Sequence, residues 1–186
     1  MPKTKSDLKS QGIAARNAIP ALERKKLSLA ICERVIASEW IAADVILSYN
    51  AFNGEVDMEA FNQWAIDSGK KVAFPICKEG YMLVAAAPHG KDGLKVGKYG
   101  IISPVEGKCD LIKASDIGLV IVPCTAFHAL TRARIGMGAG YYDRYLPQCL
   151  NAAKIGVAFE AQRVEELEAD PWDVPLDRIA TERQWH

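Results

Sequence analysis

The 186-residue sequence has few cysteines, no net charge and no apolar run long enough to span a membrane. The five cysteines are odd in number and lack C-x-x-C spacing, which argues against a disulfide framework or zinc site and fits a reducing cytoplasm. Lys and Arg number 23, as do Asp and Glu, whereas nucleic-acid-binding domains usually carry a basic excess. The longest strongly apolar stretch without charge, 117–131, is shorter than the roughly 20 residues of a spanning helix. We therefore expect a cytoplasmic protein that binds neither nucleic acid nor membranes.

Length and composition predict a single folded domain over residues 1–186. A chain of this length buries about 70% of its unfolded surface, and 49% hydrophobic with 25% charged residues is a globular composition. β-Prone apolar segments alternate with helix-like segments, which predicts an α/β fold with a mainly parallel sheet between helices. Strands are expected at 43–49, 71–74 (ending at Pro75), 81–86, 117–122, 154–159 and 178–181, helices at 4–18, 21–37, 58–67 and 141–150, and mostly loop at 88–116.

Three glycines alternate at 136, 138 and 140, between the strand 117–122 and the helix 141–150. Alternate glycines let backbone N–H groups approach a ligand closely, and the following helix N-terminus favours phosphate. Arg134 is able to bind phosphate oxygens through two N–H groups. The segment is neither a P-loop nor a dinucleotide fingerprint, because it lacks Gly-Lys-Ser/Thr and has Tyr141 in place of the third glycine. We interpret it as a phosphate-binding loop; the alternative is a connection whose glycines serve packing.

Charge is distributed unevenly along the chain. Residues 1–26 contain seven Lys and Arg against two acids, whereas 160–182 contain eight acids against two Arg. On a helix, Lys5, Lys9 and Arg16 share one narrow stripe, and such unbalanced positive charge indicates an anionic partner such as a polyphosphate. The alternative is a solvated helix. The acids of 160–182 are expected on a solvated surface, except where a resemblance described below assigns a role.

Carboxylates stand near both loops that are expected at the ligand-binding edge of the sheet. Because ligands bind at the carboxyl ends of parallel strands, the loops 50–57 and 124–140 should share that edge. Glu55 is then a candidate to hydrogen-bond a polar ligand, unless it is solvated and Asp57 merely caps the next helix. Asp143 is either a partner of the helix dipole or a Mg²⁺ ligand beside phosphates. On pattern alone, Asp173 is an ordinary surface carboxylate.

These segments together resemble the 5-formyltetrahydrofolate cyclo-ligase family over nearly the whole chain. The most specific match is 134–146 after 120–127, supported by Gly-Glu-Val-Asp at 54–57 and by the segments 99–104, 155–160 and 173–181. Lys5-x-x-Leu8-Lys9 is similar to the family's Lys-x-x-Leu-Arg. The resemblance implies a Rossmann-like three-layer domain, similar to ribose-5-phosphate isomerase and CoA-transferase domains.

The resemblance also implies an activity. A member of this family converts 5-formyltetrahydrofolate to 5,10-methenyltetrahydrofolate, with ATP as co-substrate, Mg²⁺ as cofactor and release of ADP and phosphate. Phosphorylation of the formyl oxygen would make it a leaving group for attack by N10. A monomer is expected. The alternative is a paralogue that binds nucleotide or folate without turnover; a sugar-phosphate isomerase of similar architecture is a more distant one.

Site residues follow from the resemblance, position by position. Matches to the ATP-binding positions are Lys5, Lys9, Arg134, Ile135, Gly136, Met137, Gly138, Ala139, Gly140, Tyr141 and Tyr142. Matches to the substrate-binding positions are Asn50, Glu55, Met137, Gly138, Ala139, Gly140 and Tyr141. Asp143 and Asp173 match the Mg²⁺ ligands. Catalytic roles are expected for Glu55, Arg134 and Tyr142.

The chain departs from the family pattern at three places. Lys9 replaces an arginine and so loses the bidentate fork. Phe127-His128 stands where the family often has Phe-Asp. The stretch from Phe127 to Arg134 is one residue longer than usual, which leaves open whether Arg132 or Arg134 contacts phosphate.

Overall fold

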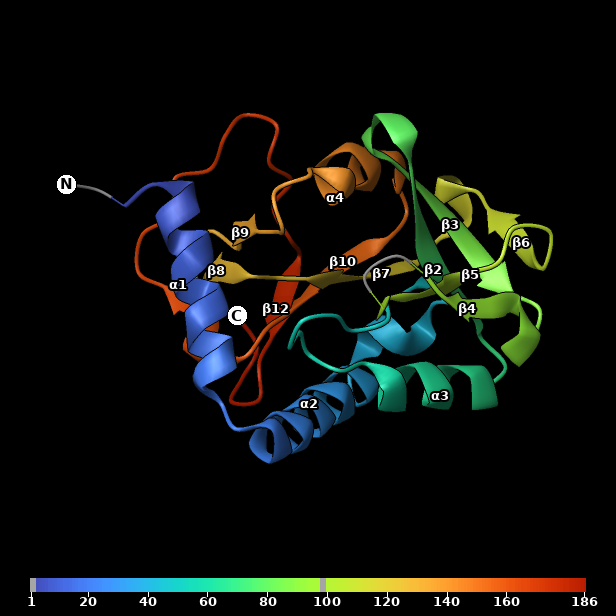
Figure 1. The fold of residues 1–186 in the computed structure, drawn as a ribbon, viewed down its shortest axis with the longest axis horizontal. Helices are drawn as coiled ribbons and strands as arrows, with labels where there is room; N and C mark the ends of the chain where they lie inside the picture. The colour runs from blue at the N-terminus through green and yellow to red at the C-terminus, as the bar shows by residue number, and fades with distance from the viewer. Residues whose placement is uncertain (1–2, 98–99) are drawn as a thin grey trace.

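In the computed structural model, which describes residues 3–97 and 100–186, a seven-stranded sheet runs through the centre of the molecule (Figure 1). Its strand order is β12-β10-β7-β1-β2-β3-β6. The first five strands in this order are parallel to their neighbours, and β3 and β6 complete the sheet in antiparallel pairing. The strand bounds are β12 Arg178–Ala180, β10 Ala153–Val157, β7 Leu119–Pro123, β1 Val45–Leu47, β2 Lys71–Lys78, β3 Met82–Pro88 and β6 Cys109–Ile112.

Helices cover both faces of this sheet, as a parallel sheet requires. The helices α2 (Ala21–Ile36) and α3 (Glu59–Asp67) lie on one face, and α4 (Tyr141–Tyr145) with the 3₁₀ turn η6 (Leu146–Gln148) lies on the other (Figure 1). Neighbouring residues of β1 show the two faces, because Ile46 packs in the core under α2 and α3 whereas Leu47 packs in the core under α4. The expected α/β fold of three layers is confirmed.

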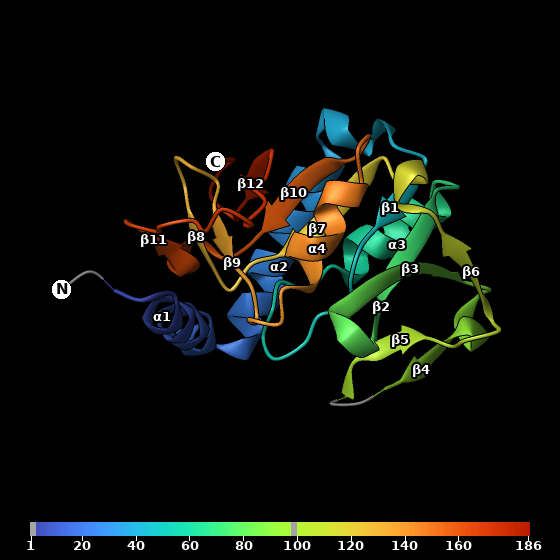
Figure 2. The same ribbon diagram turned by 90° about the horizontal axis from the view of Figure 1, so that it is seen from above.

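Helix α1 (Lys5–Ala18) lies beside the main sheet, against a small sheet of order β11-β8-β9 (Figure 2). These strands are β11 Arg163–Val164, β8 Ala126–His128 and β9 Arg134–Ile135. Thr4 and Asp7 cap the helix through reciprocal hydrogen bonds, and Leu8, Gly12 and Arg16 form its buried face. A Cβ atom on Gly12 would lie 2.1 Å from the Thr125 carbonyl oxygen. Only glycine allows this helix to approach the chain so closely.

The segment 88–116 contradicts the expectation of a loop. It contains β4 (Leu94–Val96) and β5 (Ile102–Pro104), which pair as an antiparallel hairpin, and β6, which pairs with the edge of β3. These strands are only three or four residues long, so their side-chain alternation is too short to stand out from the surrounding Gly, Pro and Lys. Tyr99 of the matched segment 99–104 lies outside the described residues.

Strand β2 does not end at Pro75 as expected but continues to Lys78. Its parallel pairing with β1 ends at Ala73, and from Phe74 onward it pairs with β3 alone. Beyond Ala73 no residue of β1 pairs with β2, so the absence of an N–H group on Pro75 removes no hydrogen bond from the sheet on that side.

None of the described helices is both long and apolar enough to cross a membrane. Further short segments of the chain form 3₁₀ turns. The turns are η1 Glu39–Ala42, η2 Glu79–Tyr81, η3 Lys91–Gly93, η5 Ala114–Asp116 and η7 Glu160–Gln162.

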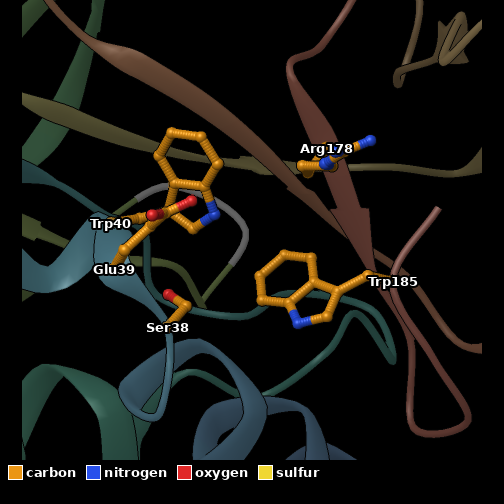
Figure 3. A pocket seen from close by; sticks show the side chains of 5 residues that line it. All are labelled: Ser38, Glu39, Trp40, Arg178 and Trp185. Atoms are coloured by element: carbon orange, nitrogen blue, oxygen red, sulfur yellow. The ribbon is translucent and has the colours of Figure 1, made fainter.

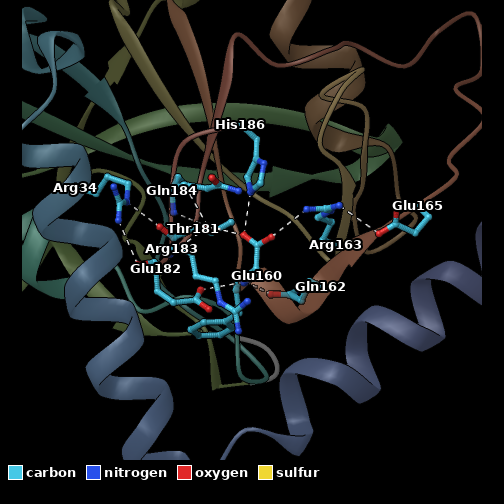
Figure 4. Close-up of polar contacts among 11 residues, drawn as sticks. Arg34, Glu160, Gln162, Arg163, Glu165, Thr181, Glu182, Arg183, Gln184 and His186 are labelled. Atoms are coloured by element: carbon cyan, nitrogen blue, oxygen red, sulfur yellow. Dashed lines mark hydrogen bonds and ion pairs between the residues drawn. The ribbon is translucent and has the colours of Figure 1, made fainter.

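Some acids of 160–182 do not lie on a solvated surface. Figure 4 shows Glu160 at the centre of a polar network that ties η7 to the end of β12. Its side chain is 11% exposed, and Oε2 accepts a hydrogen bond from Thr181 at 2.8 Å and lies 2.9 Å from His186 Nε2. Asp177 is exposed, as expected, but it also accepts a hydrogen bond from the Lys154 N–H at 2.7 Å. A net count of charge along the chain cannot detect such pairings.

The contact at Gly12 makes a testable prediction for stability. We expect Gly12→Ala to lower the free energy of unfolding by about 2 kcal/mol, because overpacking outweighs the gain in helix propensity. Urea unfolding followed by circular dichroism measures it. Gln11→Ala, at an exposed position of the same helix, is the control and should change stability little. A Gly12→Ala protein as stable as wild type would show that α1 does not depend on this contact.

Candidate active site

A cleft of about 1450 Å³ opens at the carboxyl ends of β1 and β7. The first turns of α1, the loops 49–55 and 134–144, the β2–β3 turn and the β4–β5 hairpin enclose it. The loops 50–57 and 124–140 therefore share one edge, as the strand topology predicts. Every site residue that the family resemblance implies lines this cleft, namely Lys5, Lys9, Asn50, Glu55, Arg134, Ile135, Gly136, Met137, Gly138, Ala139, Gly140, Tyr141, Tyr142, Asp143 and Asp173.

The glycine loop forms one wall of the cleft and leads into α4. Gly138 has φ +100° and Gly140, the N-cap of α4, has φ +66°, conformations that side chains with a Cβ rarely adopt. No atom lies within 4 Å of a Cβ built on Gly136, so that glycine faces open space. Lys9 Nζ donates a hydrogen bond to the Met137 carbonyl at 2.6 Å. Lys9 is thus held at the loop, not in free solvent.

The geometry distinguishes Arg134 from Arg132. The Arg134 side chain is 3% exposed, lines the cleft, and donates to Asp143 Oδ1 at 2.9 Å and to the Val174 carbonyl at 3.1 Å. Arg132 does not belong to the cleft lining; it occupies the turn between β8 and β9 with φ +56°. Of the two arginines, only Arg134 is in a position to meet a ligand in the cleft.

Lys5 joins α1 to the loop that carries Asp173. Its Nζ atom forms ion pairs with both Asp170 and Asp173. Burial alone would lower the pKa of Lys5, but the hydrogen bonds to these two carboxylates outweigh it and raise that pKa. The sequence did not single out Asp170 as a residue of the cleft. Its spacing of three residues from Asp173 is the signal that could have done so, because the two residues form a turn in which the Asp170 N–H donates to Asp173 Oδ2 at 2.8 Å.

Arg16 does not belong to a phosphate-facing stripe, and this part of the prediction is wrong. Its side chain is fully buried, one helical turn beyond Gly12, whose close contact draws that face of α1 into the protein. Of the three predicted cations, only Lys5 and Lys9 line the cleft.

Glu55 lies on the opposite side of the cleft, in a tight loop formed by Asn53 (φ +49°) and Gly54 (φ +77°). Its Oε2 atom accepts a hydrogen bond from the Phe52 N–H at 3.0 Å. Burial raises the pKa of Glu55, although the Phe52 N–H and the charge of Arg16 oppose the shift. Asp57, by contrast, accepts from the Glu59 N–H at 3.0 Å at the start of α3. Asp57 therefore stabilises the start of α3, which is the alternative given for it in the sequence analysis.

Asn50 and two tyrosines complete this side of the cleft. Asn50 Nδ2 donates to the Ile102 carbonyl at 2.8 Å, which fastens the β4–β5 hairpin over the cleft. The Tyr49 hydroxyl donates to the Val56 carbonyl at 2.7 Å, whereas the buried Tyr142 hydroxyl has no partner among the described residues. Tyr49, the hairpin and Trp172 also line the cleft, but no local pattern in the sequence marks them as parts of a site.

The predicted Mg²⁺ ligands, Asp143 and Asp173, both line the cleft and both pair with a cation. In the described ranges, Oδ2 of Asp143 and Oδ1 of Asp173 accept no hydrogen bond, so each carboxylate keeps one oxygen available. No group of three or more His, Cys, Asp or Glu side chains that could hold a metal occurs among the described residues. Such a donor set suits Mg²⁺, which takes one or two carboxylates together with phosphate oxygens and water.

A second, smaller pocket of about 600 Å³ lies outside this cleft (Figure 3). Trp40 and Trp185 flank it, with Ser38, Glu39 and Arg178 around them. It contains none of the predicted site residues.

Comparison with known proteins agrees with the family resemblance seen in the sequence. A model of the 5-formyltetrahydrofolate cyclo-ligase family matches residues 2–182. The chain belongs to this family. The related proteins are named as ligases or synthetases. The chain is accordingly a ligase of the 5-formyltetrahydrofolate cyclo-ligase family.

Individual relatives cover most of the chain. A 5-formyltetrahydrofolate cyclo-ligase of Escherichia coli K12 is 28% identical over 145 residues, which is 76% of this chain and 79% of the relative. A probable 5-formyltetrahydrofolate cyclo-ligase of Caenorhabditis elegans is 28% identical and covers 97% of this chain and 93% of its own. The solved 5,10-methenyltetrahydrofolate synthetase of Aquifex aeolicus is similar in fold, with a TM-score of 0.84, 31% identity and coverage of 97% and 91%.

The two tyrosines of this cyclo-ligase family site make opposite predictions for stability. Tyr142→Phe should raise the free energy of unfolding by about 1 kcal/mol, because it removes a buried hydroxyl without a partner. Tyr49→Phe should lower it by about 1 kcal/mol, because it removes the hydrogen bond to Val56. Denaturant unfolding of both variants measures the difference. A loss of stability in Tyr142→Phe would show that its hydroxyl bonds a group such as an ordered water.

Proposed function

We propose that this protein catalyses the ATP-dependent cyclisation of 5-formyltetrahydrofolate to 5,10-methenyltetrahydrofolate, releasing ADP and phosphate. The observation that carries the proposal is the composition of the larger cleft. Lys5, Lys9, Arg134 and the glycine loop lie on one side, and Glu55 lies on the other. A nucleotide and a polar heterocycle can therefore meet between them. We further propose that the enzyme works as a monomer in the cytoplasm.

The reaction couples two steps in which atoms and charges balance. The formyl oxygen attacks the γ-phosphorus of ATP, so an O–P bond forms and the bond to the β-phosphate oxygen breaks, releasing ADP. N10 then attacks the activated formyl carbon and loses its proton, and the C–O bond breaks to release phosphate. The five-membered ring closes with the charge shared by N5 and N10. Phosphoryl transfer of this kind asks the protein mainly for positioning and charge neutralisation.

The residues of the phosphate side provide that neutralisation. Arg134 presents a guanidinium at the glycine loop, and Lys5 and Lys9 add two ammonium groups from α1. The backbone N–H groups of 136–142 are proposed to contact the nucleotide, and Met137 to Tyr141 to border the folate as well. Tyr142 carries an unpaired hydroxyl that a ligand is able to engage. This arrangement supports the proposal that the cleft binds ATP.

Glu55 and Asn50 are proposed to bind the folate. Burial disfavours the ionised form of Glu55, while its hydrogen bond from Phe52 keeps one oxygen fixed and leaves the other free for a ligand N–H. We place the Glu55 carboxylate near N10, where it orients the nucleophile. Asp143 and Asp173 would hold Mg²⁺ with the phosphates, and the ion would supply charge neutralisation there.

A direct assay tests the proposed reaction. The protein is mixed with 5-formyltetrahydrofolate and MgATP, and the near-ultraviolet absorbance of the methenyl product is followed together with ADP. We expect the product and ADP to form in equal amounts and only when both substrates are present. Folded protein that is stabilised by MgATP or folate yet releases no ADP would favour the paralogue that only binds.

The two arginines provide an internal comparison. Arg134→Ala should lower kcat/KM about 100-fold or more, because it removes the buried cation that we propose contacts the transferred phosphate. Arg132→Ala should change it less than about threefold, since Arg132 lies outside the cleft lining. Steady-state kinetics on both variants, with Arg134→Lys to separate charge from geometry, gives the result. Equal losses, or a larger loss for Arg132→Ala, would contradict the assignment.

A further inference from the structure

The Arg16 side chain is a buried cation that the proposed reaction does not use. It is 0% exposed, and its Nε, Nη1 and Nη2 atoms have no hydrogen-bond partner within residues 3–97 and 100–186. A charged group buried without acceptors is costly to desolvate, so its presence requires a compensating interaction. Arg16 does not line the cleft, and direct contact with a ligand there is not its role.

The end of α1 that carries Arg16 supports the loop that carries Glu55. A Cβ atom on Gly54 would lie 3.1 Å from Asn17 Oδ1 and 3.8 Å from the Arg24 guanidinium carbon. Arg24 Nη1 in turn donates to the Arg16 carbonyl at 3.3 Å and to the Ile19 carbonyl at 2.9 Å. The loop 52–55 therefore rests on the last turn of α1 and on the start of α2.

Two cations lie where α1 and α2 support this loop, and they differ in their partners. Arg24 donates to the carbonyls of Arg16 and Ile19, whereas the Arg16 guanidinium is fully buried and has no acceptor among the described residues. Among the described residues whose pKa is shifted, Arg16, Tyr49, Cys124 and Tyr142 interact electrostatically with Glu55. Burial raises the pKa of both tyrosines and raises that of Cys124 to about 12, so these three are neutral near pH 7. Arg16 stays protonated, although burial lowers its pKa, because a guanidinium starts above about 12. It is the one positive charge among these four groups.

We propose that Arg16 is a positioning residue of the cleft: its buried positive charge holds Glu55 as a carboxylate directed at the ligand. Arg16 acts here at a distance through the electrostatic field, which is strong where water is excluded. The catalytic consequence rests on the proposed function, since it requires that ionised Glu55 orients the folate. The electrostatic pairing itself does not depend on that reaction.

The pairing is tested by titrating the Glu55 carboxyl carbon with ¹³C NMR, its resonance assigned by its loss in Glu55→Gln. In Arg16→Met the midpoint should rise by about one pH unit or more, because an attractive charge is lost. Arg16→Lys keeps the charge and should restore most of the shift. Lys25→Met, which removes an exposed cation from the start of α2, is the matched control and should leave the midpoint unchanged. An unmoved midpoint in Arg16→Met, or an equal rise in Lys25→Met, overturns the proposal.

Kinetics separates this proposal from the proposed function. If the wild-type enzyme is active, Arg16→Met should shift the acid limb of kcat/KM for 5-formyltetrahydrofolate to higher pH and leave KM for ATP unchanged. A moved titration in an inactive wild-type protein would reject the reaction and retain the pairing. Activity with an unmoved titration would do the reverse.

Folding provides a second route to the same answer. If Arg16→Met and Arg16→Gln do not fold, the double variant Arg16→Met/Glu55→Gln removes both charges together. Rescue of folding in the double variant supports the pairing, because neither charge is then left uncompensated. If the double variant also fails to fold, the two charges do not compensate each other and the proposal is overturned.

Discussion

The close packing of α1 on the chain at Thr125 is the contact on which the rest of the cleft depends. Gly12 permits it, since any Cβ there would collide with the Thr125 carbonyl. One turn before this point the helix brings Lys9 to the glycine loop, and nearly two turns before it Lys5 meets Asp170 and Asp173. One turn after it, Arg16 is fully buried, and the neighbouring Asn17 packs against Gly54 in the loop of Glu55. A single helix thereby connects both sides of the proposed site.

Two of the cations proposed to meet phosphate are already paired with carboxylates. Arg134 pairs with Asp143, and Lys5 pairs with Asp173. Because these residues are proposed to hold phosphate and Mg²⁺, a metal–nucleotide complex would exchange partners with these pairs and would not add charge to an unpaired site. Each carboxylate would turn from Lys5 or Arg134 to the ion, and each cation would turn from its carboxylate to phosphate. Such an exchange would keep these partly buried charges compensated, which would limit the desolvation cost of binding.

The sequence predicted the layers of the fold and the cleft lining better than it predicted the connections. Continuous β-prone runs such as 117–122 and the alternating glycines of 136–140 are local signals, and each has a physical reason that acts within a few residues. The strands β4, β5 and β6 are too short to show a period, and the extension of β2 through Pro75 depends on where β1 stops pairing. Those features are decided by neighbours that are distant in the chain, so no local pattern reveals them.

Arg16 shows the same limit at the level of one side chain. Helical periodicity correctly placed it on a common stripe with Lys5 and Lys9, yet periodicity gives a direction around the helix and not the depth of burial along it. Lys5 and Lys9 lie where α1 borders the cleft, whereas Arg16 lies beyond the Gly12 contact, where α1 has sunk against the chain. A positive charge in that position cannot reach solvent or phosphate, and Glu55 is the acid that its field reaches. The charge that looked like part of a binding surface is therefore better understood as the counter-charge of a residue on the other side of the same site.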